Sequence, residues 1–107
     1  MRIALFASIA LLATLQAGSA NAASFSCRGP HNHTEAAICD NARLSAKDSE
    51  MAFVYGQQLR ALPLSQRRVL RGQQIRWLGQ RNGCGANVGC LFQAYNLRIN
   101  DLRNLGY

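Results

Sequence analysis

Four cysteines in a chain of 107 residues constrain this fold more than any other feature, provided that the chain leaves the cytoplasm. The first residues indicate export. Arg2 precedes an uncharged run over residues 3–15, which is long enough for a secretory signal and too short to span a bilayer. Small residues at Ala20 and Ala22 favour cleavage before Ala23, with cleavage after Ala20 as the alternative. We therefore expect residues 1–22 to be a signal peptide and residues 23–107 to form one domain in the periplasm or outside the cell.

In an exported chain of this size the cysteines predict two disulfides. No two of them are spaced as C-x-x-C, which argues against a zinc site and against a thioredoxin-type redox site. Four cysteines allow three pairings. We expect the local one, Cys27 with Cys39 and Cys84 with Cys90, and the other two remain open. Either crosslink would add stability to a domain with a modest core.

The spacing of apolar residues predicts helices throughout and no sheet. Thr34 is expected to cap a short helix that includes residues 35–39. Between residues 44 and 62, apolar residues recur at helical spacing until Pro63, which ends the pattern: Leu44, Met51, Tyr55, Leu59 and Leu62.

Two further helices are expected after Pro63. The first starts near Ser65 and ends at Gly83, and the second starts after Asn87. Short connections make consecutive helices antiparallel neighbours. The predicted fold is therefore all-α: a small, disulfide-stapled three-helix bundle with a short N-terminal helix laid across it.

Several polar residues interrupt the apolar stripes of these helices. An unpaired charge in a core costs several kcal/mol, so we expect these residues to pair with one another in a structural network. Its expected members are Asp48, Tyr55, Arg81, Tyr95 and Arg98.

Two segments carry a resemblance to a known family. They read Gln-x-x-Trp-Leu-x-x-Arg-x-x-Cys over residues 74–84 and Cys-Leu-x-x-x-Tyr-x-x-Arg-Ile over residues 90–99. With Glu35-Ala36-Ala37-Ile38-Cys39 before them, they resemble the LprI-type lysozyme-inhibitor family of exported bacterial domains. The resemblance covers nearly all of residues 23–107. It implies a secreted or envelope-attached helical domain with two disulfides that inhibits lysozyme by binding, without catalysis.

The chain departs from the family pattern at two places. Lys47 stands where an apolar residue usually precedes Asp48, and the segment between the first two cysteines carries His31-Asn32-His33. Both departures concern a partner surface more than the fold. The two histidines and Glu35 could form only a weak metal site, so we expect a solvated loop, with no metal and no cofactor.

Catalysis has little support in the sequence. Asp48 lacks the second carboxylate that a glycosidase needs, and no serine has a histidine at a meaningful spacing. The glycine-rich stretch 83–89 follows no strand and does not fit a phosphate-binding loop. We therefore expect a binding protein and not an enzyme.

Charge supplies the remaining signal. The net charge is +7, and no acidic residue occurs between Glu50 and Asp101. Clustered arginines favour bidentate contacts with carboxylates or phosphates. We expect a partner surface at Arg60, Arg67, Arg68 and Arg71. Its partner is a lysozyme or another peptidoglycan hydrolase, or alternatively an anionic envelope polymer or acidic protein. Nucleic acid is not expected for an exported chain without an aromatic-studded basic face.

Overall fold

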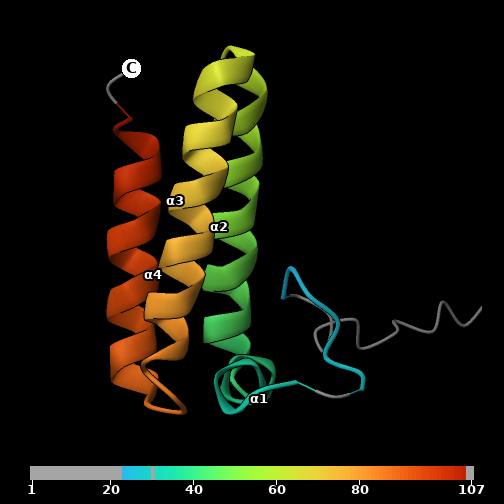
Figure 1. Cartoon of the computed structure of the whole chain (residues 1–107). Coiled ribbons are helices and arrows are strands. Elements are labelled where there is room, and N and C mark those ends of the chain that lie inside the picture. The colour runs from blue at the N-terminus through green and yellow to red at the C-terminus, as the bar shows by residue number, and fades with distance from the viewer. Residues whose placement is uncertain (1–22, 30, 106–107) are drawn as a thin grey trace, which may run out of the picture.

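The computed structural model describes residues 23–29 and 31–105, and its regular structure there is entirely helical. In chain order the helices are α1 (His33–Asp40), α2 (Ala42–Ala61), α3 (Leu64–Asn82) and α4 (Val88–Arg103). Helices α2, α3 and α4 lie side by side as an antiparallel bundle, and α1 crosses one end of it (Figure 1). The predicted three-helix bundle with a short N-terminal helix is confirmed. The predicted signal peptide, residues 1–22, lies outside the described residues.

Asparagines fix three of the four helix starts. The side chain of Asn87 accepts from the backbone N–H of Cys90, and that of Asn41 accepts from Arg43 and Leu44. At α1 the predicted cap, Thr34, is wrong. Asn32 caps the helix instead, in a reciprocal pair with Glu35, because its side-chain oxygen reaches the third helical N–H while the Glu35 carboxylate accepts from the Asn32 backbone.

Thr34 has a different role, which is to dock α1 on the bundle. Its side chain is buried, and its hydroxyl donates to the carbonyl oxygens of Gly85 at 2.9 Å and Asn82 at 3.2 Å. These carbonyls belong to the turn between α3 and α4. The short first helix is thereby held against the same end of the bundle as that turn (Figure 1).

Pro63 separates α2 from α3 as expected. Leu62 is extended, because a residue before proline is disfavoured in the helical region, and α3 begins at Leu64, one residue earlier than predicted. Pro63 offers no side-chain cap. On the other side of the turn, the Arg67 guanidinium donates to the carbonyl oxygen of Leu62 at 2.8 Å and so satisfies an acceptor at the end of α2.

The core lies mainly between α2 and α4, which contact each other far more extensively than either contacts α3. From α3 only Leu70 and Trp77 join the fully apolar core. The other core residues are Ala23, Ile38, Leu44, Met51, Val54, Leu91, Tyr95, Ile99 and Leu102. None of the described helices has the length and apolarity needed to cross a bilayer.

Both disulfides have the local pairing. Cys27 is joined to Cys39, which ties the N-terminal segment to α1, and Cys84 is joined to Cys90, which closes the turn between α3 and α4. No free cysteine occurs in the described part of the chain. Crosslinks of this kind are typical of proteins in oxidising compartments.

Candidate functional site

Asp48 is the centre of a buried polar cluster where α2, α3 and α4 meet. Its side chain has no exposed surface, and the Arg81 guanidinium, whose residue is 4 % exposed, lies 3.6 Å from its Oδ1. The Tyr95 hydroxyl donates to the same Oδ1 at 2.6 Å and accepts from Arg81 at 3.3 Å. The structure therefore brings together three of the five predicted members of the network.

Ser24 completes the cluster, and sequence reasoning missed it. The Ser24 backbone N–H and hydroxyl both donate to Oδ2 of Asp48, at 2.6 Å and 2.5 Å. Beside it, the Phe25 ring lies 5.7 Å from the Arg81 guanidinium carbon. The segment before Cys27 has no helical periodicity, so no sequence signal marked Ser24 as a partner of a residue 24 positions away.

The cluster neutralises and satisfies its own charges. Both carboxylate oxygens of Asp48 accept hydrogen bonds, and Arg81 also donates to the side chain of Asn82 at 2.9 Å. Burial, followed by the hydrogen bond to Asp48, raises the pKa of the Tyr95 hydroxyl well above its ordinary value. With no accessible carboxylate and a tyrosine that resists ionisation, the cluster holds the helices in register and offers no group to a substrate.

The other two predicted network members, Tyr55 and Arg98, have different surroundings. Tyr55 is half-buried and makes no hydrogen bond with a described residue; it lies seven residues after Asp48 on α2, about 10 Å further along the helix axis. Arg98 is buried, but its Nε donates to the Gln74 side chain at 3.0 Å, and Gln74 in turn donates to the Met51 sulfur at 3.0 Å. Tyr55 thus takes no part in the hydrogen bonds of the Asp48 cluster, and the membership of Arg98 in the network stays a prediction.

The predicted arginine surface divides into one structural and three exposed side chains. Arg67 is half-buried, and its guanidinium caps α2 by donating to the Leu62 carbonyl oxygen. Arg60, Arg68 and Arg71 are exposed. Arg68 and Arg71 lie one turn apart on α3, on the same stripe as the exposed apolar residues Leu64 and Ile75.

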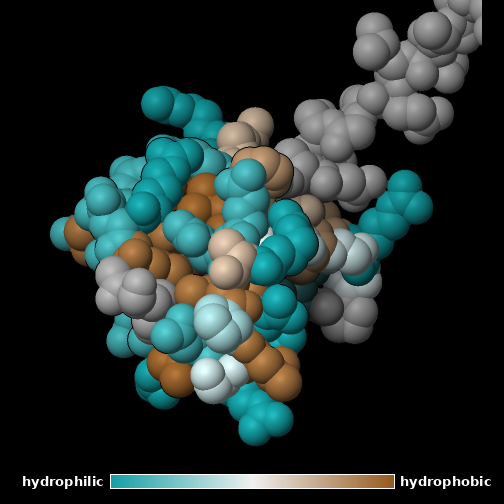
Figure 2. Space-filling view, turned by 90° about the horizontal axis from the view of Figure 1, so that it is seen from above, coloured by the Kyte–Doolittle hydropathy of each residue, from teal (hydrophilic) through white to brown (hydrophobic). Residues whose placement is uncertain are grey.

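We call Arg60, Arg68 and Arg71 the arginine surface. None of these arginines forms an ion pair with a residue in the described part of the chain, and α3 contains no acidic residue. Seen from the end where α2 turns into α3, hydrophilic and apolar side chains are interspersed over the tip of the bundle (Figure 2). This surface can therefore take an anionic partner that also has apolar groups.

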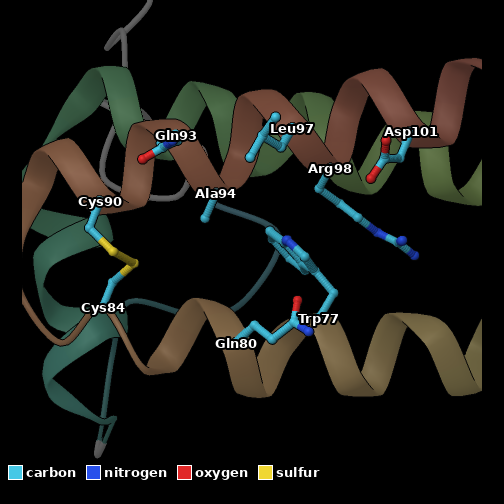
Figure 3. Close-up of a pocket in the computed structure, with 9 residues that line it drawn as sticks. All are labelled: Trp77, Gln80, Cys84, Cys90, Gln93, Ala94, Leu97, Arg98 and Asp101. Carbon is cyan, nitrogen blue, oxygen red and sulfur yellow. A yellow bond between two sulfur atoms is a disulfide. The ribbon is translucent and has the colours of Figure 1, made fainter.

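A groove of about 350 Å³ separates α3 from α4 on another side of the bundle. Trp77 reaches from α3 toward α4 inside it, and the Cys84–Cys90 disulfide closes one end (Figure 3). Its remaining lining is Gln80, Gln93, Ala94, Leu97, Arg98 and Asp101. The sequence motif that includes Trp77 and Arg98 predicted a family, but nothing in it indicated an opening between the two helices.

The histidine pair lies where the sequence placed it, on exposed backbone at the start of α1. Glu35, the hard ligand considered beside it, is used in the capping pair with Asn32. Within residues 23–29 and 31–105, no group of three or more histidine, cysteine or acidic residues is arranged to hold a metal ion.

Comparison with other proteins adds no assignment: no protein-family model matches the chain, and no curated protein or solved structure matches it either. Two surfaces thus remain as candidates, the arginine surface and the groove over Trp77.

Proposed function

We propose that this chain is an exported binding protein that inhibits a lysozyme-type peptidoglycan hydrolase, with the arginine surface as its contact. The observation that carries the proposal is that Arg60, Arg68 and Arg71 are exposed on a helical scaffold with no acidic residue on α3 to neutralise them. The two disulfides support export, and the resemblance to the LprI-type inhibitors supports the class of target.

The chemistry of the target fits this surface. Lysozyme-type glycosidases cleave with two carboxyl groups that flank the scissile bond. A guanidinium offers a planar fork of donors that matches a carboxylate, and it stays charged at any physiological pH. An exposed arginine inserted between the two carboxyl groups would neutralise the ionised carboxylate and block the substrate. Leu64 and Ile75 beside the arginines supply apolar contact area.

The same geometry supports action by binding instead of catalysis. Asp48, at the centre of the buried polar cluster, has no exposed side-chain surface. It makes four hydrogen-bond or ionic contacts, with Ser24, Tyr95 and Arg81. A carboxylate in that setting positions helices and reaches no substrate.

The test is an inhibition titration of the mature, oxidised protein against lysozymes of several classes, both basic and acidic, at several ionic strengths. We expect inhibition at micromolar protein, and we expect the Arg68→Ala/Arg71→Ala double variant to weaken it by about tenfold or more, as for the loss of about 1.4 kcal/mol of contact energy. The matched control is Arg28→Ala/Arg103→Ala, which removes the same charge from exposed positions outside α3.

Ionic strength separates long-range from short-range effects. A strongly basic lysozyme would be repelled by the mature protein, whose net charge is +6 because Arg2 is removed with residues 1–22, so the association rate should rise with added salt while the contact itself persists. Absence of inhibition of every lysozyme class at micromolar protein would refute the proposal.

A second candidate is an envelope-associated module that binds anionic polymers through the same arginines. It is favoured by the spread of exposed Arg68, Arg71 and Arg76 over more than two turns of α3, which suits a repeating polyanion. This candidate predicts retention on an anionic polysaccharide matrix that decreases steeply with salt. The double variant at Arg68 and Arg71 should reduce that retention more than its charge-matched control does.

A further inference from the structure

Trp77 forms the floor of the groove between α3 and α4. Trp77 is 7 % exposed, so more than nine-tenths of it is buried, yet its indole N–H donates to no described residue. The N–H is not among the buried polar atoms that lack a partner, so it is accessible to solvent although most of the ring is buried. The accessible strip of the indole lies in the groove, where the ring reaches toward α4 (Figure 3). An available donor is thus held at the base of an open space.

The rest of the indole is held in place by the core. The Tyr95 ring meets it edge-on with centroids 5.3 Å apart, and the Arg81 guanidinium carbon lies 6.0 Å from its ring centroid. Both partners belong to the Asp48 cluster, which is itself fully bonded. These two ring contacts and its burial hold the indole against the core, so the floor of the groove is preorganised.

The exposed polar groups around the floor are mainly uncharged amides. Exposed Gln80 and Gln93 each carry an amide that both donates and accepts, one from α3 and one from α4. Asp101 brings one exposed carboxylate to the groove, whereas Arg98, whose guanidinium is buried and donates to Gln74, points away from the other lining side chains (Figure 3). A lining of this kind suits a neutral ligand with many donors and acceptors, in contrast to the arginine surface, which suits an anion.

The volume of the groove and its apolar lining further limit the chemical class of the ligand. A volume of about 350 Å³ lies at the lower end of the range for small-molecule sites, roughly 300–1,000 Å³. Leu97, which is 58 % exposed, and Ala94 add apolar wall beside the indole. A sugar ring combines hydroxyl groups at its edge with an apolar C–H face, and an acetamido group adds both a donor and an acceptor for the glutamines. We propose that this groove binds a neutral N-acetylated hexosamine unit of one or two rings.

This proposal does not depend on the inhibitor function, because it uses different residues and a different face of α3. The chain contains one tryptophan, so its intrinsic fluorescence reports the groove directly. Titration of the oxidised protein with N,N′-diacetylchitobiose should produce a saturable change in Trp77 emission. Cellobiose, which has the same linkage and lacks the acetamido groups, should bind more weakly by about tenfold, as for the loss of one or two hydrogen bonds.

Variants locate the site and guard against a folding artefact. Gln80→Ala/Gln93→Ala should weaken diacetylchitobiose binding by about tenfold, whereas Gln57→Ala, at an exposed glutamine of α2, should leave it unchanged. Trp77→Phe keeps an aromatic ring and removes the N–H, so isothermal calorimetry should show weaker binding with an unchanged helical circular dichroism spectrum. The proposal is overturned by an absent or linear fluorescence response, by equal binding of cellobiose, or by a double variant that binds like the wild type.

Discussion

The two ends of α3 place arginine in opposite environments. Near its C-terminus, Arg81 is 4 % exposed and shares Asp48 with Tyr95 and the N-terminal segment. In its N-terminal half, Arg68 and Arg71 are exposed and have no acidic neighbour on the helix. Helix α3 is continuous from Leu64 to Asn82, so the difference in arginine exposure comes from the residues that surround each end. Arg81 stabilises the fold because its partners are fixed, and the exposed arginines remain available to a partner.

The contrast extends to the packing around each end. The C-terminal end meets α1 through Thr34 and is closed by the Cys84–Cys90 disulfide. The N-terminal half has no disulfide in the described residues and is held by the Pro63 turn, the Arg67 cap and the buried Leu70. Stability should therefore concentrate near Asp48, and binding near Arg68. Three variants, two single and one double, test this division, from the largest expected loss of stability to the smallest.

Replacing Asp48 with alanine should destabilise the fold most. It leaves the Arg81 charge buried without its carboxylate and frees Ser24 from the bundle, and breaking a buried ion pair costs about 3–5 kcal/mol. Urea denaturation followed by circular dichroism measures the loss. Asp40→Ala, at an exposed acid at the end of α1, serves as the control and should change the free energy of unfolding by less than about 0.5 kcal/mol. Similar values for the two variants would contradict a stabilising role for the cluster.

Replacing Tyr95 with phenylalanine should cost less, about 1–3 kcal/mol, because only the hydroxyl and its bonds to Asp48 and Arg81 are lost. The pH dependence is more specific. The pKa of Tyr95 is raised in the folded state, so folding favours the protonated hydroxyl. The stability it contributes is complete below its ordinary pKa of 10.0 and is lost as the pH rises above that value.

The measurement for Tyr95 is the free energy of unfolding between about pH 8 and about pH 11. Wild-type protein should lose stability above about pH 10 more steeply than Tyr95→Phe, because only the wild type has the Tyr95 hydroxyl, whose pKa is raised by folding. Parallel curves for the two proteins would show that Tyr95 does not couple folding to pH.

Replacing Arg68 and Arg71 with alanine should have the smallest effect on stability, within about 0.5 kcal/mol, because neither side chain has an ionic partner in the part of the chain that the structure describes. Arg67→Ala is the informative comparison. It removes a cap from the Leu62 carbonyl and should destabilise by about 1 kcal/mol. Thermal unfolding measures the destabilisation of both variants. A larger loss of stability in Arg68→Ala/Arg71→Ala than in Arg67→Ala would contradict the division between the two ends of α3.

The sequence predicted much of the fold because helical spacing and cysteine spacing are local signals. Leu44 and Met51 lie in the core as the apolar stripe indicated, and both cysteine pairs close over short stretches of chain. Pro63 ends α2 because its ring disfavours a helical conformation of the preceding residue, and this local effect does not depend on tertiary contacts. Asn32 and Thr34 were harder to separate, because either side chain can cap a helix and tertiary contacts decided between them.

The polar contacts were predicted less well because periodicity indicates on which face of a helix a residue lies. It does not indicate which residues of neighbouring helices lie at the same height along the bundle axis. Tyr55 and Tyr95 both lie on apolar stripes, but only Tyr95 is level with Asp48. Arg98 pairs with Gln74, 24 residues away, and the Ser24 contact spans the same separation from a segment without periodicity. The groove over Trp77 likewise depends on how far apart α3 and α4 lie, which no residue pattern encodes.

The order of the disulfides has a consequence for how this protein matures. Each cysteine is joined to the next one along the chain, first to second and third to fourth. An oxidant that acts on thiols in the order in which they emerge during synthesis therefore makes the native pairs directly. The chain should reach its crosslinked form with a donor of oxidising equivalents alone, and an isomerase that reshuffles wrong pairs should add little to its yield.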